Sequence, residues 1–240
     1  MSSKKDEIAS NLAAMVDFIE RAAHDHADII VFPEMSLTGY FTSSKYLSSA
    51  ISVEDIRVKK IIALSKTYGL TIIFGLSEKD GDRTYISQLV AQDGQLSGIY
   101  RKHNVINEEA GIFTPSENSP IFDLGRLKFG ITICADIDLP ELFEEYAKSG
   151  CNIVFECASP NLYGDRKNRD WEKGYAWWKI RCVEKIGQYA LRNKMMIAVA
   201  TQRGRDIDDD FPGGGYLFSQ NGELLAETKD HRQDMLLVEI

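Results

Sequence analysis

Short runs of apolar, mostly β-branched residues recur along the chain, separated by segments with helical periodicity. These runs cover residues 27–32, 70–74, 130–133, 152–155 and 195–201. Continuous apolar runs of this length are typical of strands that are buried on both faces of a sheet. We therefore expect an α/β protein in which helices cover the sheets.

The segments between these runs supply the helices and hairpins. Apolar side chains recur three or four residues apart in residues 6–26 and 53–68, and Asp170 is placed to cap a longer helix that ends near residue 193. Asp93-Gly94 indicates a hairpin between two strands, which adds antiparallel pairing and makes the sheets mixed. No repeat or domain boundary is evident, so residues 1–240 are expected to form a single domain. Further expected elements are strands at 121–124, 127–134, 216–219, 224–228 and 235–240, a helix at 140–148, and loops at 160–169 and 205–215.

Charge and composition exclude several classes of function. The net charge of −8 argues against general binding of a phosphate backbone, so no nucleic-acid partner is expected. No apolar run approaches the ~18 residues of a spanning helix, and the first residues lack the apolar core of a signal peptide. We expect a cytoplasmic protein that does not interact with membranes. The four cysteines form no CxxC pair, so thiols are expected and a structural zinc site is not.

Three reactive side chains stand where predicted strands end. Glu34 follows the run at 27–32, Lys102 ends the hairpin, and Cys134 ends the run at 130–133, where Asp136 and Pro140 favour a change from strand to helix. A thiol at such a turn is exposed beside backbone N–H groups, as nucleophiles are in other hydrolases. Taken alone, Cys134 is more typical of a buried core thiol and Glu34 of a solvated loop carboxylate. Lys102 taken alone is more typical of a basic patch on the surface.

The three positions become specific when their surrounding motifs are considered together. FPEMSLTGY at residues 32–40, YRKHN at 100–104 and ITICADIDLPE at 131–141 occur in this order, and the chain resembles the nitrilase superfamily of carbon-nitrogen hydrolases. The resemblance continues through the helix at 171–193 and the AVATQRG and FPGGG segments. It implies a four-layer α-β-β-α sandwich of two mixed sheets.

The resemblance also implies roles for individual residues. Glu34 would be the general base, Lys102 the cation that stabilises the tetrahedral intermediate, and Cys134 the nucleophile. A second, supporting glutamate usually precedes the aromatic residue of the FTP segment by four positions, which selects Glu109, with Glu108 as the weaker alternative. No metal ion or organic cofactor is implied.

Several positions depart from the family's pattern. Ala135 stands where tyrosine or tryptophan usually follows the nucleophile, although its backbone N–H is still expected to face the oxyanion. Asn104 replaces a usual histidine, Thr201 a frequent asparagine and Gly215 a frequent serine. These changes weaken any borrowed assignment of substrate.

By resemblance, we expect hydrolysis of a small linear carboxamide to a carboxylic acid and ammonia through a cysteine thioester. Hydrolysis of an N-carbamoyl compound or a nitrile is the alternative within the superfamily, and a catalytically impaired binding or scaffold protein is the alternative from another class. A homodimer or larger assembly is expected, with Trp177 and Trp178 as candidates for the contact.

The start of the chain lacks one element of the family. Members ordinarily have a hydrophobic strand before their first helix, whereas here the first predicted element is the helix at residues 6–26. A missing strand leaves backbone groups and apolar surface without their usual partner, so lower stability than that of intact relatives is expected.

Overall fold

The computed structural model describes residues 1–232 and 235–240. The chain divides into two compact units. The amino-terminal unit is residues 2–118, and the carboxy-terminal unit is Met1 with residues 119–240. Each unit has its own mixed sheet and its own helices. The expectation of a single domain over residues 1–240 stays a prediction.

A four-stranded sheet with the order β1-β2-β3-β4 forms the centre of the amino-terminal unit. β1 and β2 are parallel, and β2, β3 and β4 pair as antiparallel hairpins. Asp93 and Gly94 turn the second hairpin with φ angles of 51° and 75°, the left-handed pair that a two-residue hairpin loop requires. The elements are α1 (Ile8–His24), β1 (Ile29–Val31), α2 (Ile56–Tyr68), β2 (Thr71–Asp80), β3 (Arg83–Gln92), β4 (Gln95–Arg101) and two short 3₁₀ helices, η1 (Ser44–Ser49) and η2 (Asn107–Gly111).

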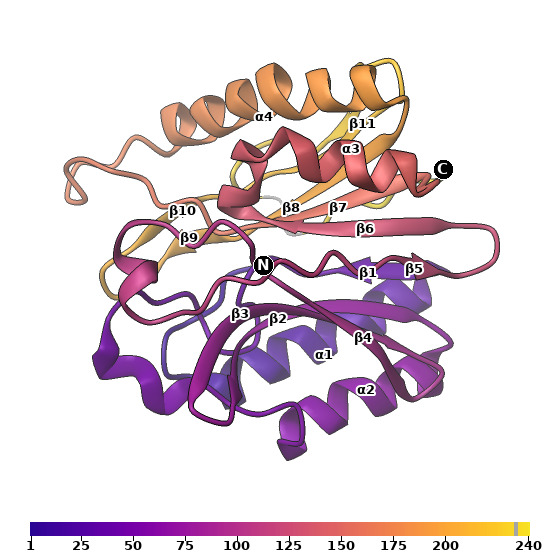
Figure 1. Cartoon of the computed structure of the whole chain (residues 1–240). Coiled ribbons are helices and arrows are strands. Elements are labelled where there is room, and N and C mark those ends of the chain that lie inside the picture. The colour runs from indigo at the N-terminus through magenta and orange to yellow at the C-terminus, as the bar shows by residue number, and fades with distance from the viewer. Residues whose placement is uncertain (233–234) are drawn as a thin grey trace. The chain divides into compact units, whose positions relative to one another are not determined.

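The helices α1 and α2 cover one face of this sheet (Figure 1). α1 buries one stripe of side chains, among them Leu12, Met15 and Ile19, at the spacing of a single helical face. α2 begins at the Asp55 cap, whose carboxylate accepts the N–H of Arg57, and ends at Gly69 in the left-handed conformation.

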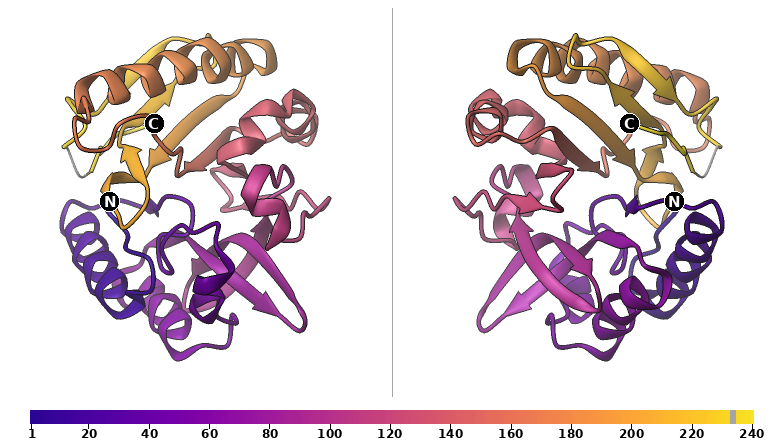
Figure 2. Two further views of the ribbon diagram at one scale, coloured as in Figure 1. Left: turned by 90° about the vertical axis from the view of Figure 1, so that its left-hand side faces the viewer. Right: turned by 90° about the vertical axis from the view of Figure 1, so that its right-hand side faces the viewer.

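The carboxy-terminal unit contains a six-stranded sheet with the order β12-β11-β8-β7-β6-β5. β6, β7 and β8 are parallel, and the outer strands are antiparallel. Within this unit α3 and α4 lie over the sheet (Figure 2). The elements are β5 (Phe122–Asp123), β6 (Lys128–Ile133), the 3₁₀ helix η3 (Cys134–Asp138), α3 (Pro140–Lys148), β7 (Ile153–Ala158), α4 (Trp171–Asn193), β8 (Met196–Thr201), β9 (Arg203–Arg205), β10 (Asp210–Pro212), β11 (Gly215–Phe218) and β12 (Leu224–Glu227).

Local chemistry explains how α3 and α4 are placed. Pro140 occupies the first turn of α3, where its missing N–H costs nothing, and Asp170 caps α4 by accepting the N–H of Lys173. The ring of Tyr146 on α3 packs so closely over β6 that a Cβ on Gly130 would lie 2.5 Å from it. Glycine is therefore required at this point of the strand.

The expected fold class is confirmed: the protein is α/β, and each unit contains one mixed sheet with helices packed on it. Among the described residues, the first element is α1 and residues 1–7 form no strand. No helix in the described part of the chain has the length and apolar character needed to span a membrane.

Three expectations about elements were wrong. β2 does not end at Gly75 but continues to Asp80, because the glycine there leaves room for the side chain of Gln88 on β3. The segment 205–215 is not all loop, since β9 and β10 pair in it as an antiparallel ribbon. Residues 235–240 form no strand, so the expected strand there was wrong.

The two tryptophans proposed for a contact surface differ in exposure. Trp178 is only 2% exposed, and its indole N–H donates to Thr201 Oγ1 at 2.8 Å, so its assignment to a surface was wrong. Trp177, the next residue along α4, is 44% exposed. A helix turns by about 100° per residue, so adjacent side chains point to different environments.

Candidate active site

A buried cluster of one lysine and two glutamates lies in the amino-terminal unit. Lys102 Nζ donates to Glu34 Oε1 and to Glu109 Oε1, each at 2.8 Å. All three side chains are almost completely buried. Charged groups enter a protein interior only when they are paired, and here two carboxylates enclose one ammonium. The cluster therefore carries a formal net charge of −1 within the unit.

A strained turn after β1 presents Glu34. Met35, the next residue, has φ of 48° and is completely buried, although such an angle is uncommon for a residue with a side chain. Gln88 Nε2 donates to Phe32 O at 2.9 Å, and Ser36 Oγ accepts the N–H of Gly75 at 3.0 Å. The turn is thus fixed on both sides of the carboxylate by β2 and β3.

Lys102 is the first residue after β4. Its backbone N–H donates to Ile86 O at 2.9 Å, and its carbonyl accepts the N–H of Ser116 at 3.0 Å. The hairpin β3-β4 therefore delivers the ammonium into the unit, while its neighbour Arg101 points to Glu78 and Asp80.

The second glutamate of the cluster is Glu109, on η2. Its Oε2 accepts the N–H of Ile106, and its Oε1 accepts from both Lys102 and the hydroxyl of Tyr40, the latter at 2.8 Å. Glu108, the alternative from sequence, is exposed. The structure thus brings Glu34, Lys102 and Glu109 together.

Cys134 lies in the carboxy-terminal unit, directly after β6 and at the start of η3. Its φ is 49°, so the thiol is carried on a left-handed residue at a sharp strand-to-helix turn. The carboxylate of buried Asp136 accepts the N–H of Ile133 at 2.9 Å, and Tyr146 donates to Ile131 O at 2.7 Å. These bonds hold the end of the strand in place while the thiol stays partly accessible.

The other cysteines are poor nucleophiles. Cys151, Cys157 and Cys182 are buried free thiols, whereas Cys134 is partly exposed. Burial raises the pKa of Cys151 to about 11 and the pKa of Cys182 well above the ordinary value. Thiolate character at neutral pH is therefore disfavoured at these two positions.

The side chain of Ala135 is buried beside the nucleophile. A methyl group there takes little of the space that an aromatic ring would fill. Residue 135 therefore fills less space beside Cys134 than the tyrosine or tryptophan that is usual in the family.

A second buried charge cluster was missed in the sequence. Asp210 on β10 is completely buried and pairs with three guanidinium groups. Contiguous acidic residues in a loop, such as residues 208–210, are usually solvated, but here Asp209 and Asp210 are both buried. No spacing signal identifies the partners, because two of them lie in the loop after β7 and the third ends β9. They are Arg166, Arg169 and Arg205, at 3.0, 2.9 and 3.2 Å.

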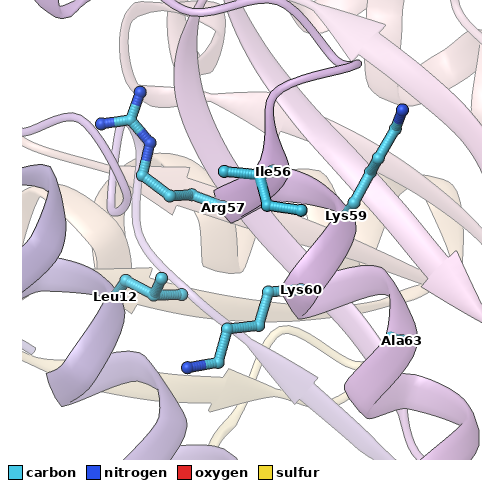
Figure 3. Close-up of a pocket in the computed structure, with 6 residues that line it drawn as sticks. All are labelled: Leu12, Ile56, Arg57, Lys59, Lys60 and Ala63. Atoms are coloured by element: carbon cyan, nitrogen blue, oxygen red, sulfur yellow. The ribbon is translucent and has the colours of Figure 1, made fainter.

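One surface hollow is lined by none of the site residues described above. Among the residues that the structure describes, no three His, Cys, Asp or Glu side chains group so as to hold a metal ion. A hollow of about 410 Å³ opens on the helical face of the amino-terminal unit, and it contains none of the three clustered side chains (Figure 3). It is lined by Leu12 of α1 and by Ile56, Arg57, Lys59, Lys60 and Ala63 of α2.

The sequence profile named Carbon-nitrogen hydrolase matches residues 1–240. The chain belongs to the carbon-nitrogen hydrolase family. The chain is 25% identical to a glutamine-dependent NAD(+) synthetase of Acinetobacter baylyi over 95% of its length, and it spans 40% of the synthetase. It is 26% identical to a citrullinase of Francisella tularensis, with 98% of this chain and 84% of the citrullinase covered.

A solved structure shows the same fold. It is a mutant of an amidase from Nesterenkonia sp. AN1, in which the acetamide moiety of fluoroacetamide is added covalently at the active-site cysteine. The TM-score is 0.80 at 21% identity, covering 95% of this carbon-nitrogen hydrolase and 82% of the amidase. At this identity the likeness establishes the fold alone.

Proposed function

We propose that this carbon-nitrogen hydrolase cleaves a small linear carboxamide to a carboxylic acid and ammonia, with Cys134 as the nucleophile, Glu34 as the general base and Lys102 as the stabilising cation. The observation that carries the proposal is the buried ammonium of Lys102 between two carboxylates, Glu34 and Glu109. The desolvation penalty of buried charges can exceed the attraction between them, and such groups are common at functional sites.

The first half-reaction forms a thioester. An amide carbonyl is a weak electrophile, so Glu34 takes the thiol proton as Cys134 Sγ attacks the carbonyl carbon. The oxyanion of the tetrahedral intermediate is stabilised by Lys102 and by a backbone N–H near Ala135, and one such donor is typically worth about 3 kcal/mol. Collapse breaks the C–N bond, and the proton held by Glu34 leaves with ammonia.

In the second half-reaction, water replaces the thiol as the nucleophile. Glu34 takes a proton from this water as the water oxygen attacks the thioester carbon, and Lys102 again stabilises the oxyanion. The C–S bond breaks, the proton returns to the sulfur and the acid is released. Glu109, which accepts a hydrogen bond from Lys102 Nζ, is a second carboxylate partner of the ammonium in both half-reactions.

Hydrolysis of an N-carbamoyl compound is the second candidate. The observation that favours it is the likeness to a citrullinase over 84% of that protein's length. A carbamoyl group presents the same carbonyl and the same leaving nitrogen, so the residues proposed above would act unchanged. Nitrile hydrolysis and a purely binding role are further alternatives.

Ammonia release from a panel of primary amides, carbamoyl compounds and nitriles tests the proposal, with Cys134→Ala as the matched control. We expect release from amides, with the acyl group detected on Cys134 by intact-mass analysis. A chain that releases no ammonia, forms no adduct and leaves Cys134 unreactive to iodoacetamide would have a binding role instead.

We also propose that two copies associate through α4. Trp177, Ile180 and Val183 expose apolar side chains on this helix. Light scattering after size exclusion, comparing the natural chain with an Ile180→Lys variant, measures this directly. A monomeric natural chain would contradict it.

A further inference from the structure

Tyr40 is the last residue of the FPEMSLTGY motif, which also contains the proposed base Glu34. It lies six residues after Glu34, and its hydroxyl donates to Glu109 Oε1 at 2.8 Å. That oxygen is the one to which Lys102 Nζ also donates. One hydroxyl thus joins the segment that carries Glu34 to the segment that carries Glu109.

The backbone holds Tyr40 in a defined place relative to Glu34. The N–H of Gly39 donates to Met35 O at 2.8 Å, which closes a turn between the two residues. Gly39 has φ of 77°, and a Cβ there would lie 2.4 Å from Lys4 O. The turn therefore has little freedom, and the hydroxyl is aimed by the fold rather than by rotation of a loose segment.

Ring packing holds the two segments together without the hydroxyl. Phe41 and Phe113 lie with their ring centroids 5.5 Å apart, and both are buried. The N–H of Phe113 donates to Glu109 O at 2.8 Å, which ties this ring to η2. The hydroxyl of Tyr40 is therefore an addition to contacts that already fix the segments.

We infer that Tyr40 is a positioning residue, whose hydroxyl holds Glu109 as the fixed anion against Lys102. The inference rests on the proposed function. Glu109 accepts from Tyr40, from Lys102 and from the N–H of Ile106, and donors to a carboxylate stabilise its charged form. With Glu109 fixed as the anion, the cluster keeps Lys102 cationic while Glu34 gains and loses its proton.

The test is Tyr40→Phe, which removes one oxygen and keeps the ring. The matched control is Tyr68→Phe, since Tyr68 also donates to a carboxylate, Glu20 Oε1 at 3.0 Å, but on the surface of the helices. We expect Tyr40→Phe to lower kcat for a hydrolysed amide, and the rate of alkylation of Cys134 by iodoacetamide, by about tenfold. The KM and the unfolding midpoint of Tyr40→Phe should equal those of Tyr68→Phe.

The double variant Tyr40→Phe/Glu109→Gln shows whether the effect passes through Glu109. Alkylation of Cys134 should then be no slower than in Glu109→Gln alone. An unchanged kcat in Tyr40→Phe, a change in KM alone, or a lower unfolding midpoint than that of Tyr68→Phe would overturn the inference. A natural chain that neither releases ammonia nor is alkylated at Cys134 would instead remove the proposed function on which it rests.

Discussion

The two units bury charge in opposite ratios. In the amino-terminal unit one cation is enclosed by two carboxylates, whereas in the carboxy-terminal unit one carboxylate is enclosed by three guanidinium groups. Both clusters pair their charges, so pairing alone does not separate a functional cluster from a structural one. The two clusters differ instead in the further hydrogen-bond partners of their charged groups.

The guanidinium cluster is also bonded to backbone carbonyls. Arg169 donates to Tyr163 O and Leu162 O, and Arg166 donates to Ile207 O and Asp206 O. These bonds fasten the loop after β7 to the ribbon β9-β10. The lysine cluster instead joins two acidic side chains, and one of them, Glu34, directly precedes the left-handed residue Met35. These bonds support a structural role for the guanidinium cluster, whereas the proposed function assigns the lysine cluster to catalysis.

The largest expected effect comes from Glu34→Gln, which keeps the shape of the side chain and removes the proposed base. kcat should fall by about 10³-fold, within the range for loss of a general base. The free energy of unfolding should not fall, since one of two like charges near Lys102 is removed. Steady-state ammonia release and urea unfolding measure the two quantities. A variant that loses stability rather than kcat would make the lysine cluster structural.

The matched change in the other cluster is Asp210→Asn. The free energy of unfolding should fall by about 2 kcal/mol, because the charged acceptor of three guanidinium groups is lost while one oxygen remains. Urea unfolding at neutral pH measures it. The effect on kcat should be far smaller than that of Glu34→Gln, and an equal loss of kcat would erase the distinction between the clusters.

Acid should remove the contribution of Asp210. Burial raises its pKa, but the hydrogen bonds from Arg166 and Arg169 outweigh this and hold the pKa below the ordinary value of 3.8. A lowered pKa in the folded state stabilises the protein above the ordinary value, and this stabilisation is lost as the pH falls below it. The difference in unfolding free energy between the natural chain and Asp210→Asn should therefore shrink below pH 3.8. A difference that is constant with pH would contradict the assignment.

The smallest effect concerns the thiols. Burial raises the pKa of Cys151 to about 11, and Cys157 and Cys182 are buried as well, so only Cys134 should react quickly with a thiol reagent in the folded protein. All four should react after unfolding. Peptide mapping after brief iodoacetamide treatment checks this, and fast labelling at a second cysteine would show that burial does not protect it.

The sequence predicted most of the fold because local signals agreed with it. The helical spacing of residues 6–26, the Asp93-Gly94 turn and the Asp170 cap each correspond to an observed element. The errors lie where distant partners decide. Gly75 stays in its strand because Gln88 occupies the space beside it, and residues 235–240 are not part of a strand.

The candidate site was reached through ordered motifs rather than through local pattern. Glu34 and Lys102 are 68 residues apart, and their contact is not readable from either neighbourhood. The cluster around Asp210 was missed for the same reason, since Arg166 and Arg169 precede it by more than 40 residues. The bond from Tyr40 to Glu109 belongs with these, because it depends on how two loops meet.

The central claim is that Cys134 forms a thioester with help from the lysine cluster. Rapid quenching of the chain with a hydrolysed primary amide, followed by intact-mass analysis and peptide mapping, observes that intermediate. We expect an acyl adduct on Cys134 that forms at least as fast as ammonia is released and is absent from Cys134→Ala. Ammonia release that persists in Cys134→Ala would contradict it.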